Sequence, residues 1–231
     1  MNWKVLLIVP VWLVAAMGCK KNEGKNDLQI QLNYKIDNLP LKFDTLLYHC
    51  EAGYNYEVTR LHYYLSGFVF TMTDGTMYNH NQVYYVDARQ VSTNTISLPS
   101  FPKGICNKLS FYIGIDSLKN KTDSLPATFD NINMGWPDAM GGGYHFVKLE
   151  GHYLDSAVSK GFAMHIGKNQ FLVPVEINNP TITSGKLSLT MNINEWFRNP
   201  YLYDFKLHGS YSMNSDSAMQ LLSANGKDVF D

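Results

Sequence analysis

Two histidines carry the clearest metal-binding chemistry in this 231-residue sequence. His145 follows three consecutive glycines and opens a predicted strand, and His165 lies in a second short strand, 161–167. If these strands are antiparallel neighbours, their side chains come within about 5 Å of each other. Two neutral imidazoles at that separation suit copper or zinc. Hydrogen-bonded structural histidines are the competing interpretation, because a lone strand histidine needs no metal.

Methionine sulfur adds to the same two segments. Met140 precedes the glycines, and Met164 is the neighbour of His165. Thioethers are soft ligands that favour Cu(I), although methionine also fills gaps in cores. His152 is a third, weaker histidine candidate, since it follows the turn at Gly151.

The motifs of common enzymes and nucleotide sites are missing from the sequence. There is no Gly-x-Ser-x-Gly element, and the three glycines precede a strand instead of a helix. Asp130, Asn131, Asn133 and Asp138 lack the spacing of a calcium loop. We therefore predict a protein that is not an enzyme, with a hydrolase as the residual alternative.

Composition excludes two further classes. The chain is 45% apolar and 17% charged, with a formal net charge of −1. Disordered chains combine low hydrophobicity with high net charge, and nucleic-acid binding needs a basic surplus. A globular domain that does not bind nucleic acid is expected.

The N-terminus has the pattern of a secretory signal. Lys4 precedes an apolar run over 5–16 that is too short to span a membrane, and the run ends in Ala16-Met17-Gly18-Cys19. This ending resembles a bacterial lipobox, with Ala16 in place of the usual leucine. The resemblance implies a signal peptide over 1–18, a lipid on Cys19, a tether over 19–27 and attachment to the outer membrane. An ordinary signal peptide cut nearby is the alternative.

The two other cysteines form a candidate disulfide. Cys50 and Cys106 remain once Cys19 is lipidated, and the envelope is an oxidising compartment. Two separate buried thiols are the competing interpretation.

Alternating hydrophobicity predicts strands through most of residues 28–231. In 28–36 every second residue is apolar, and the same pattern recurs in 108–116 and 186–194. Ser215 or Asp216 can cap a short C-terminal helix. We predict a single immunoglobulin-like antiparallel β-sandwich, all-β, with that helix and a long inserted loop over 117–143. Loops of that length are often functional.

Three stretches resemble the MbnP-like family, methanobactin-associated copper-binding proteins of the bacterial envelope. The first covers 58–68, Asp74-Gly75 and 84–88. The second is 111–117. The third covers Met134-Gly-Trp136 through 143–151, and then 162–167. The resemblance implies a β-sandwich that binds copper through histidines and an oxidised tryptophan, a kynurenine made by a di-haem enzyme. His165 matches the family's His-(Leu/Ile)-Gly element, and Trp136 matches its Met-x-Trp element. His145 is added by proximity. Many members carry a second tryptophan where this chain has Met140 and glycines.

The function implied is a lipid-anchored envelope protein that holds copper for storage, scavenging or delivery. Its metal residues are His145, His165, Trp136, Met140 and Met164, and its partners are the membrane and a di-haem oxidase or outer-membrane transporter. The alternative is a surface lipoprotein that binds a non-metal ligand or a protein. It would use the 117–143 loop and a tyrosine-rich face, whose residues are Tyr48, Tyr54, Tyr56, Tyr63, Tyr64, Tyr84 and Tyr85.

Overall fold

The computed structural model describes residues 26–231. The predicted signal peptide, the lipidation site Cys19 and the tether up to residue 25 lie outside this range. Within residues 26–231, no helix is both long and apolar enough to cross a bilayer.

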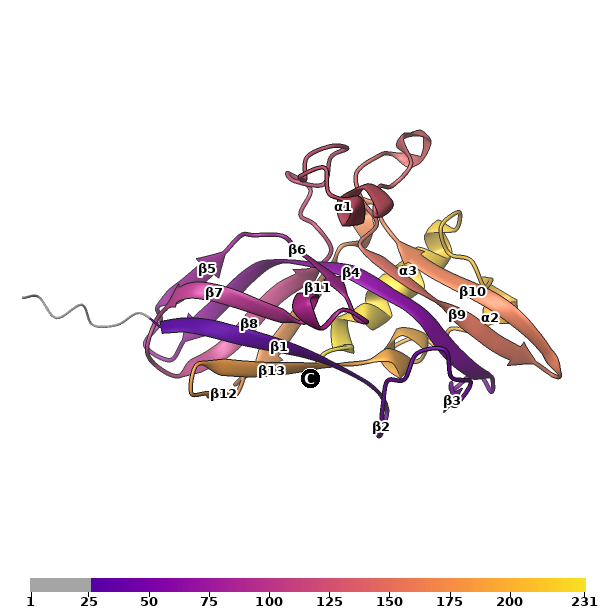
Figure 1. Cartoon of the computed structure of the whole chain (residues 1–231), viewed down its shortest axis with the longest axis horizontal. Coiled ribbons are helices and arrows are strands. Elements are labelled where there is room, and N and C mark those ends of the chain that lie inside the picture. Colours follow the sequence, from indigo (N-terminus) through magenta and orange to yellow (C-terminus); the bar gives the residue numbers. More distant parts are fainter. Residues whose placement is uncertain (1–25) are drawn as a thin grey trace, which may run out of the picture.

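Two β-sheets form a sandwich (Figure 1). The smaller sheet has the order β12 (Ile182–Thr183), β13 (Lys186–Asn192), β1 (Asn26–Ile36) and β2 (Leu39–Pro40), and β7 (Thr95–Phe101) also pairs with β1. The larger has the order β10 (Val158–Ile166), β9 (Val147–Asp155), β4 (Asn55–Met72), β8 (Cys106–Ile113) and β11 (Val173–Asn178). Strand β4 also pairs with β3 (Tyr48–His49), β5 (Met77–His80) and β6 (Tyr84–Asp87). The predicted all-β antiparallel sandwich is confirmed, with one parallel pair, β1 with β13.

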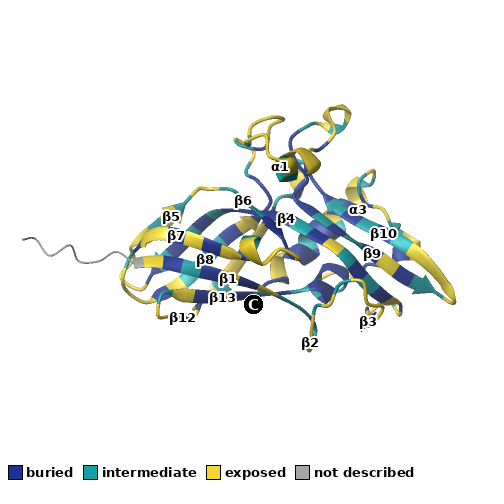
Figure 2. Ribbon diagram, viewed as in Figure 1, coloured by how far each residue is buried: buried dark blue, intermediate teal, exposed yellow. Residues whose placement is uncertain are grey.

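The predicted alternation determines which face of each strand is buried. In β1, Leu28, Ile30 and Leu32 are at most 2% exposed, whereas the residues between them are half-buried or exposed. The banded pattern of burial along the strands shows the same alternation (Figure 2). Burial of apolar surface between the sheets is the main stabilising term of such a fold.

The tyrosines of the proposed binding face are mostly core residues. Tyr48, Tyr54, Tyr56, Tyr63 and Tyr64 are each at most 8% exposed. Several of their rings meet other aromatic rings edge-on, as Tyr56 does with Phe162 and Phe197. These rings pack the core instead of presenting a surface.

Helices are few and short among the described residues. The predicted C-terminal helix is α3 (Asp216–Asn225), and the Ser215 hydroxyl caps it by accepting from the Ala218 amide. The others are α1 (Phe129–Asn133) and α2 (Phe205–His208). Five 3₁₀ turns complete the set: η1 (Val91–Thr93), η2 (Asp138–Met140), η3 (Asn169–Phe171), η4 (Ile193–Phe197) and η5 (Gly226–Asp228).

The inserted loop forms a lobe on one side of the sandwich. It contains α1 and η2, neither of which the sequence patterns predicted, and its surface is largely exposed (Figures 1 and 2). The Thr128 hydroxyl caps α1 by accepting from the Asn131 amide. The lobe therefore has local structure of its own where it meets β9.

The predicted disulfide between Cys50 and Cys106 is wrong. Both are free, buried thiols. Cys50 hydrogen-bonds Tyr54 just before β4, whereas Cys106 pairs with Met72 at the far end of β4. An 18-residue strand separates these ends by roughly 50 Å at about 3.3 Å per residue, and a disulfide needs Cα atoms within about 7 Å.

Candidate metal centre

A short antiparallel contact between the lobe and the start of β9 positions His145. Gly135 bridges to Tyr144, and the Trp136 amide donates to the Gly143 carbonyl at 2.8 Å. The His145 amide donates to the Met134 carbonyl at 2.7 Å. His145 is consequently held just before β9, and only 3% of its surface is exposed.

The three glycines make the turn that permits this contact. Gly141, Gly142 and Gly143 all have positive φ. A Cβ on Gly143 would lie 2.4 Å from the Asn120 side-chain oxygen, which accepts from the Tyr144 amide. Glycine is required here for both conformation and space.

The hydrogen bonding of His145 leaves one ring nitrogen free. Its Nδ1 lies 3.1 Å from the Met134 carbonyl oxygen. A carbonyl only accepts, so Nδ1 carries the proton and Nε2 has the lone pair. Nε2 is buried and has no hydrogen-bond partner within the described part of the chain. An unpaired buried acceptor is costly, so this atom is the first indication of a ligand.

In His165, on β10, the hydrogen-bonded ring nitrogen is Nε2 instead of Nδ1. Its Nε2 lies 2.9 Å from Glu150 Oε1, and Arg60 Nη1 donates to both Glu150 oxygens at 2.9 and 3.1 Å. Burial opposes ionisation of Glu150, but the His165 hydrogen bond and the Arg60 charge outweigh it and lower its pKa to about 2. Because an ionised carboxylate only accepts, neutral His165 donates from Nε2 and keeps its lone pair on Nδ1.

The structure brings the two imidazoles together. Their ring centroids are 5.0 Å apart and the ring planes are nearly perpendicular, at 88°. A metal bound by both rings at about 2 Å per nitrogen needs the nitrogens within about 4 Å, which rings at this separation can meet. The residues therefore fit a metal ion.

Electrostatics keep His145 in the form that can ligate. Burial, the charge of Lys148 and the neighbouring His165 together lower the pKa of His145 to about 3. The ring is neutral throughout the physiological range, as a metal ligand must be.

Trp136 closes one side of the histidine pair. Its ring centroid lies 4.7 Å from that of His145, and its Nε1 donates to the Met140 carbonyl at 3.2 Å. The indole also packs on Gly167, at the end of β10, where an added Cβ would come within 2.3 Å of the ring. With 2% exposure, the tryptophan is part of the packed wall of the site.

Gly167→Ala is expected to destabilise the protein by about 2 kcal/mol, because the buried Trp136 ring and the end of β10 must move apart. Urea unfolding measures the change in free energy. Gly161→Ala on β10 is the control, since its Cβ meets the end of the Tyr211 side chain at 3.2 Å and the Gly151 carbonyl oxygen at an ordinary contact distance of 4.0 Å. Equal losses in the two variants would contradict the close packing of Trp136 on Gly167.

The two methionines are not placed alike. Met140 lies four residues after Trp136 in the lobe and is half-buried. Met164 is 1% exposed on the core face of β10, the face opposite to that of His165, because adjacent strand residues point to opposite sides. The Met164 thioether is not brought to the histidine pair.

Two other features limit the donor set. His152 pairs with Glu57 at 2.8 Å and lies opposite Gly161, four residues along β10 from His165. Within residues 26–231, no group of three or more His, Cys, Asp or Glu side chains is arranged to hold a metal. The centre therefore offers two imidazole nitrogens.

The sequence patterns missed the residues that orient the histidines: Glu150, Arg60 and the Met134 carbonyl. One signal was available for Glu150. It is two residues from Lys148 on β9, and Lys148 lies directly opposite His165. Given that register, alternation along β9 places Glu150 on the same face as His165.

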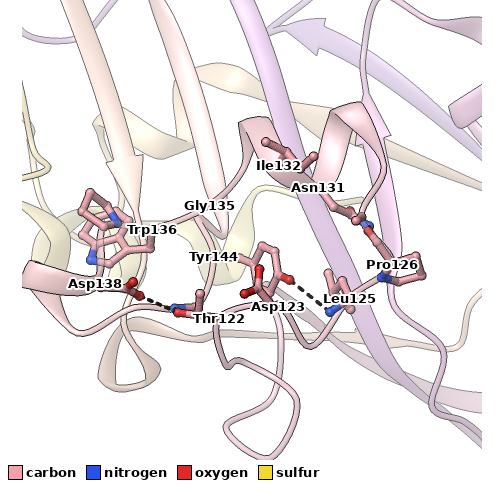
Figure 3. A pocket seen from close by; sticks show the side chains of 13 residues that line it. Thr122, Asp123, Leu125, Pro126, Asn131, Ile132, Gly135, Trp136, Asp138 and Tyr144 are labelled. Carbon is pink, nitrogen blue, oxygen red and sulfur yellow. Dashed lines mark hydrogen bonds between the residues drawn. The ribbon is translucent and has the colours of Figure 1, made fainter.

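The lobe also forms a cavity of about 520 Å³ (Figure 3). Trp136 and Asp138 lie on one side, Leu125 and Pro126 on the other, with Tyr144 between them (Figure 3). Thr122 donates to Asp138 at 2.7 Å and the Leu125 amide donates to the Tyr144 hydroxyl at 3.0 Å. Neither His145 nor His165 lines this cavity, although Trp136 belongs both to its lining and to the wall of the candidate metal centre.

The fold and the site together define an all-β sandwich in which a buried histidine and a half-buried one lie together beside a tryptophan. The family model MbnP matches residues 25–216, and the chain belongs to that family. The predicted family is thereby confirmed.

One solved structure shares the fold. MbnP from Methylosinus trichosporium matches with a TM-score of 0.53 at 12% sequence identity, over 77% of this chain and 79% of that chain. At this identity the match shows the fold alone. No curated protein matches. The family relationship suggests a methanobactin-associated, copper-related role.

Proposed function

We propose that this chain is a lipid-anchored envelope protein that binds copper at His145 and His165, for storage, scavenging or delivery. One observation carries the proposal: the buried Nε2 of His145 has no partner among residues 26–231, and its ring lies against that of His165. The family relationship supplies copper as the metal.

Each residue has a distinct part in holding the ion. His145 Nε2 and His165 Nδ1 are the ligating atoms, because their other nitrogens donate to Met134 and Glu150. Partners of this kind fix the orientation and tautomer of metal-binding histidines. Trp136 shields the His145 side from water.

The donor set favours Cu(I) over zinc. Structural zinc sites almost always have four ligands in a tetrahedron, whereas two imidazoles are supplied here. Met140 follows Trp136 and offers a soft donor within the lobe, which also suits Cu(I).

Trp136 is the residue that a di-haem oxidase would modify if this chain follows the family pattern. Its ring lies 4.7 Å from that of His145, so an oxidised side chain would stand beside the copper ligands. Anchoring through Cys19 would place the protein at the outer membrane, where such an oxidase or a transporter can meet it.

Titration with Cu(I) against a competing chelator tests the proposal. We expect one copper per wild-type chain, and His165→Ala should weaken binding by at least about 100-fold, since even outer-shell changes cost 10- to 100-fold. His152→Ala is the control, because this exposed histidine pairs with Glu57. If His165→Ala retains wild-type stoichiometry and affinity, the proposed site is wrong.

A second function has support from the cavity in the lobe. Its volume of about 520 Å³ is in the usual range for small-ligand sites, and it combines apolar walls with Asp123 and Asp138. The protein would then bind a non-metal ligand through the lobe. Failure to bind Cu(I), together with NMR shifts at the cavity residues on adding carbohydrates or peptides, would favour this function.

A further inference from the structure

A positive side chain stands beside the histidine pair. Lys148 on β9 lies directly opposite His165 on β10, and both point to the outer face of the larger sheet. Directly opposed residues have Cβ atoms about 5 Å apart. The Lys148 charge acts on His145 as well, since it contributes to the low pKa of that ring.

The lobe fixes the position of this cation. Lys148 Nζ donates to the carbonyl of Asn133, the last residue of α1. Its side chain is half-buried. The ammonium group is therefore held where β9 meets the end of α1.

Neighbouring charges do not cancel it. Glu150, the carboxylate whose charge acts on Lys148, is already engaged by Arg60 and His165. Across the sheet, one row runs from His165 through Lys148 and His62 to Asp87. Asp87 is three strands from His165, about 14 Å at roughly 4.8 Å per strand.

We propose that Lys148 is a specificity-determining residue that excludes divalent cations from the histidine pair and leaves it to monovalent copper. This inference rests on the proposed copper site. A positive charge repels a divalent ion twice as strongly as a monovalent one at the same distance. A zinc site with four protein ligands can offset such repulsion through its additional metal–ligand bonds. The histidine pair supplies only two donors, so the extra repulsion of a divalent ion is not offset.

Competition titrations with Cu(I) and Zn(II) on wild type, Lys148→Gln and Lys148→Arg test the inference. At an effective dielectric near 20, removing one charge about 7 Å away should strengthen Cu(I) binding by about 10-fold or more and Zn(II) binding by the square of that factor. The Cu(I)-to-Zn(II) affinity ratio is expected to fall at least about 10-fold in Lys148→Gln. Lys148→Arg keeps the charge and should keep the ratio.

An unchanged ratio in Lys148→Gln overturns the charge role while leaving the copper site intact. Loss of Cu(I) binding in Lys148→Gln also overturns it, because Lys148 would then be a ligand. If none of the three proteins binds either metal, both the copper site and the inference fail. A urea unfolding curve shows that each variant is folded before titration.

Discussion

His145→Asn is expected to make the metal-free protein more resistant to acid than wild type. In the unfolded chain, His145 takes up a proton near its ordinary pKa of about 6.5, whereas in the folded protein burial and Lys148 lower its pKa to about 3. The unfolded state therefore binds more protons between these values, and stability falls as pH falls through this window.

The loss from His145 is about 2 kcal/mol between pH 6.5 and 5, at about 1.36 kcal/mol per pH unit. Asparagine does not titrate and can still donate to the Met134 carbonyl. Urea unfolding of wild type and His145→Asn at pH 7 and pH 5 measures the difference. Over this range Glu150, with a pKa of about 2, remains ionised in the folded protein.

The same variant should lose copper. Asparagine has no atom at the position of Nε2, so Cu(I) affinity is expected to fall by at least about 100-fold. His152→Asn is the matched control for both readouts, because its side chain is 49% exposed and pairs with Glu57. Equal pH slopes in wild type and His145→Asn would contradict the assigned burial of a neutral imidazole.

Glu150→Gln is expected to weaken Cu(I) binding by about 10- to 100-fold without removing a ligand, as outer-shell changes do. Glu150 is the acceptor that fixes the His165 tautomer, and Arg60 keeps it ionised. The glutamine amide can donate from its NH₂ group to His165 Nε2. That donation favours the tautomer with its lone pair on Nε2 and its proton on Nδ1, the ligating atom. Stability should fall by about 2 kcal/mol, since charge-assisted hydrogen bonds are lost.

Glu57→Gln is the matched control for Glu150→Gln. Glu57 pairs with His152 at 2.8 Å on the same sheet but away from the centre. In a His165→Ala background, Glu150→Gln should have no further effect on copper affinity. Equal effects of Glu150→Gln with and without His165 would show that Glu150 acts by some other route.

Local patterns in the sequence predicted the strands well. The alternation in 28–36 depends on burial of one face, and β1 buries Leu28, Ile30 and Leu32 as expected. The C-terminal helix was also predictable, because a capping serine is a local signal. The five-residue helix α1 was not, since so short a segment has no hydrophobic periodicity.

Contacts between distant residues were predictable only where the two segments belong to neighbouring strands of one hairpin. The hairpin of β9 and β10 brings the His145 and His165 segments together, as expected. The pairing of Cys50 with Cys106 failed because nothing in the sequence shows that they lie at opposite ends of β4. Arg60 was missed for the same reason: its contact with Glu150 joins residues 90 positions apart.

The most direct test is NMR of the histidine side-chain nitrogens during titration with Cu(I). Before copper, His145 should show a protonated Nδ1 and His165 a protonated Nε2. One equivalent of Cu(I) is expected to shift His145 Nε2 and His165 Nδ1 while both N–H groups persist and His152 is unchanged. Shifts confined to other histidines, or none at this pair, would contradict a copper centre at His145 and His165.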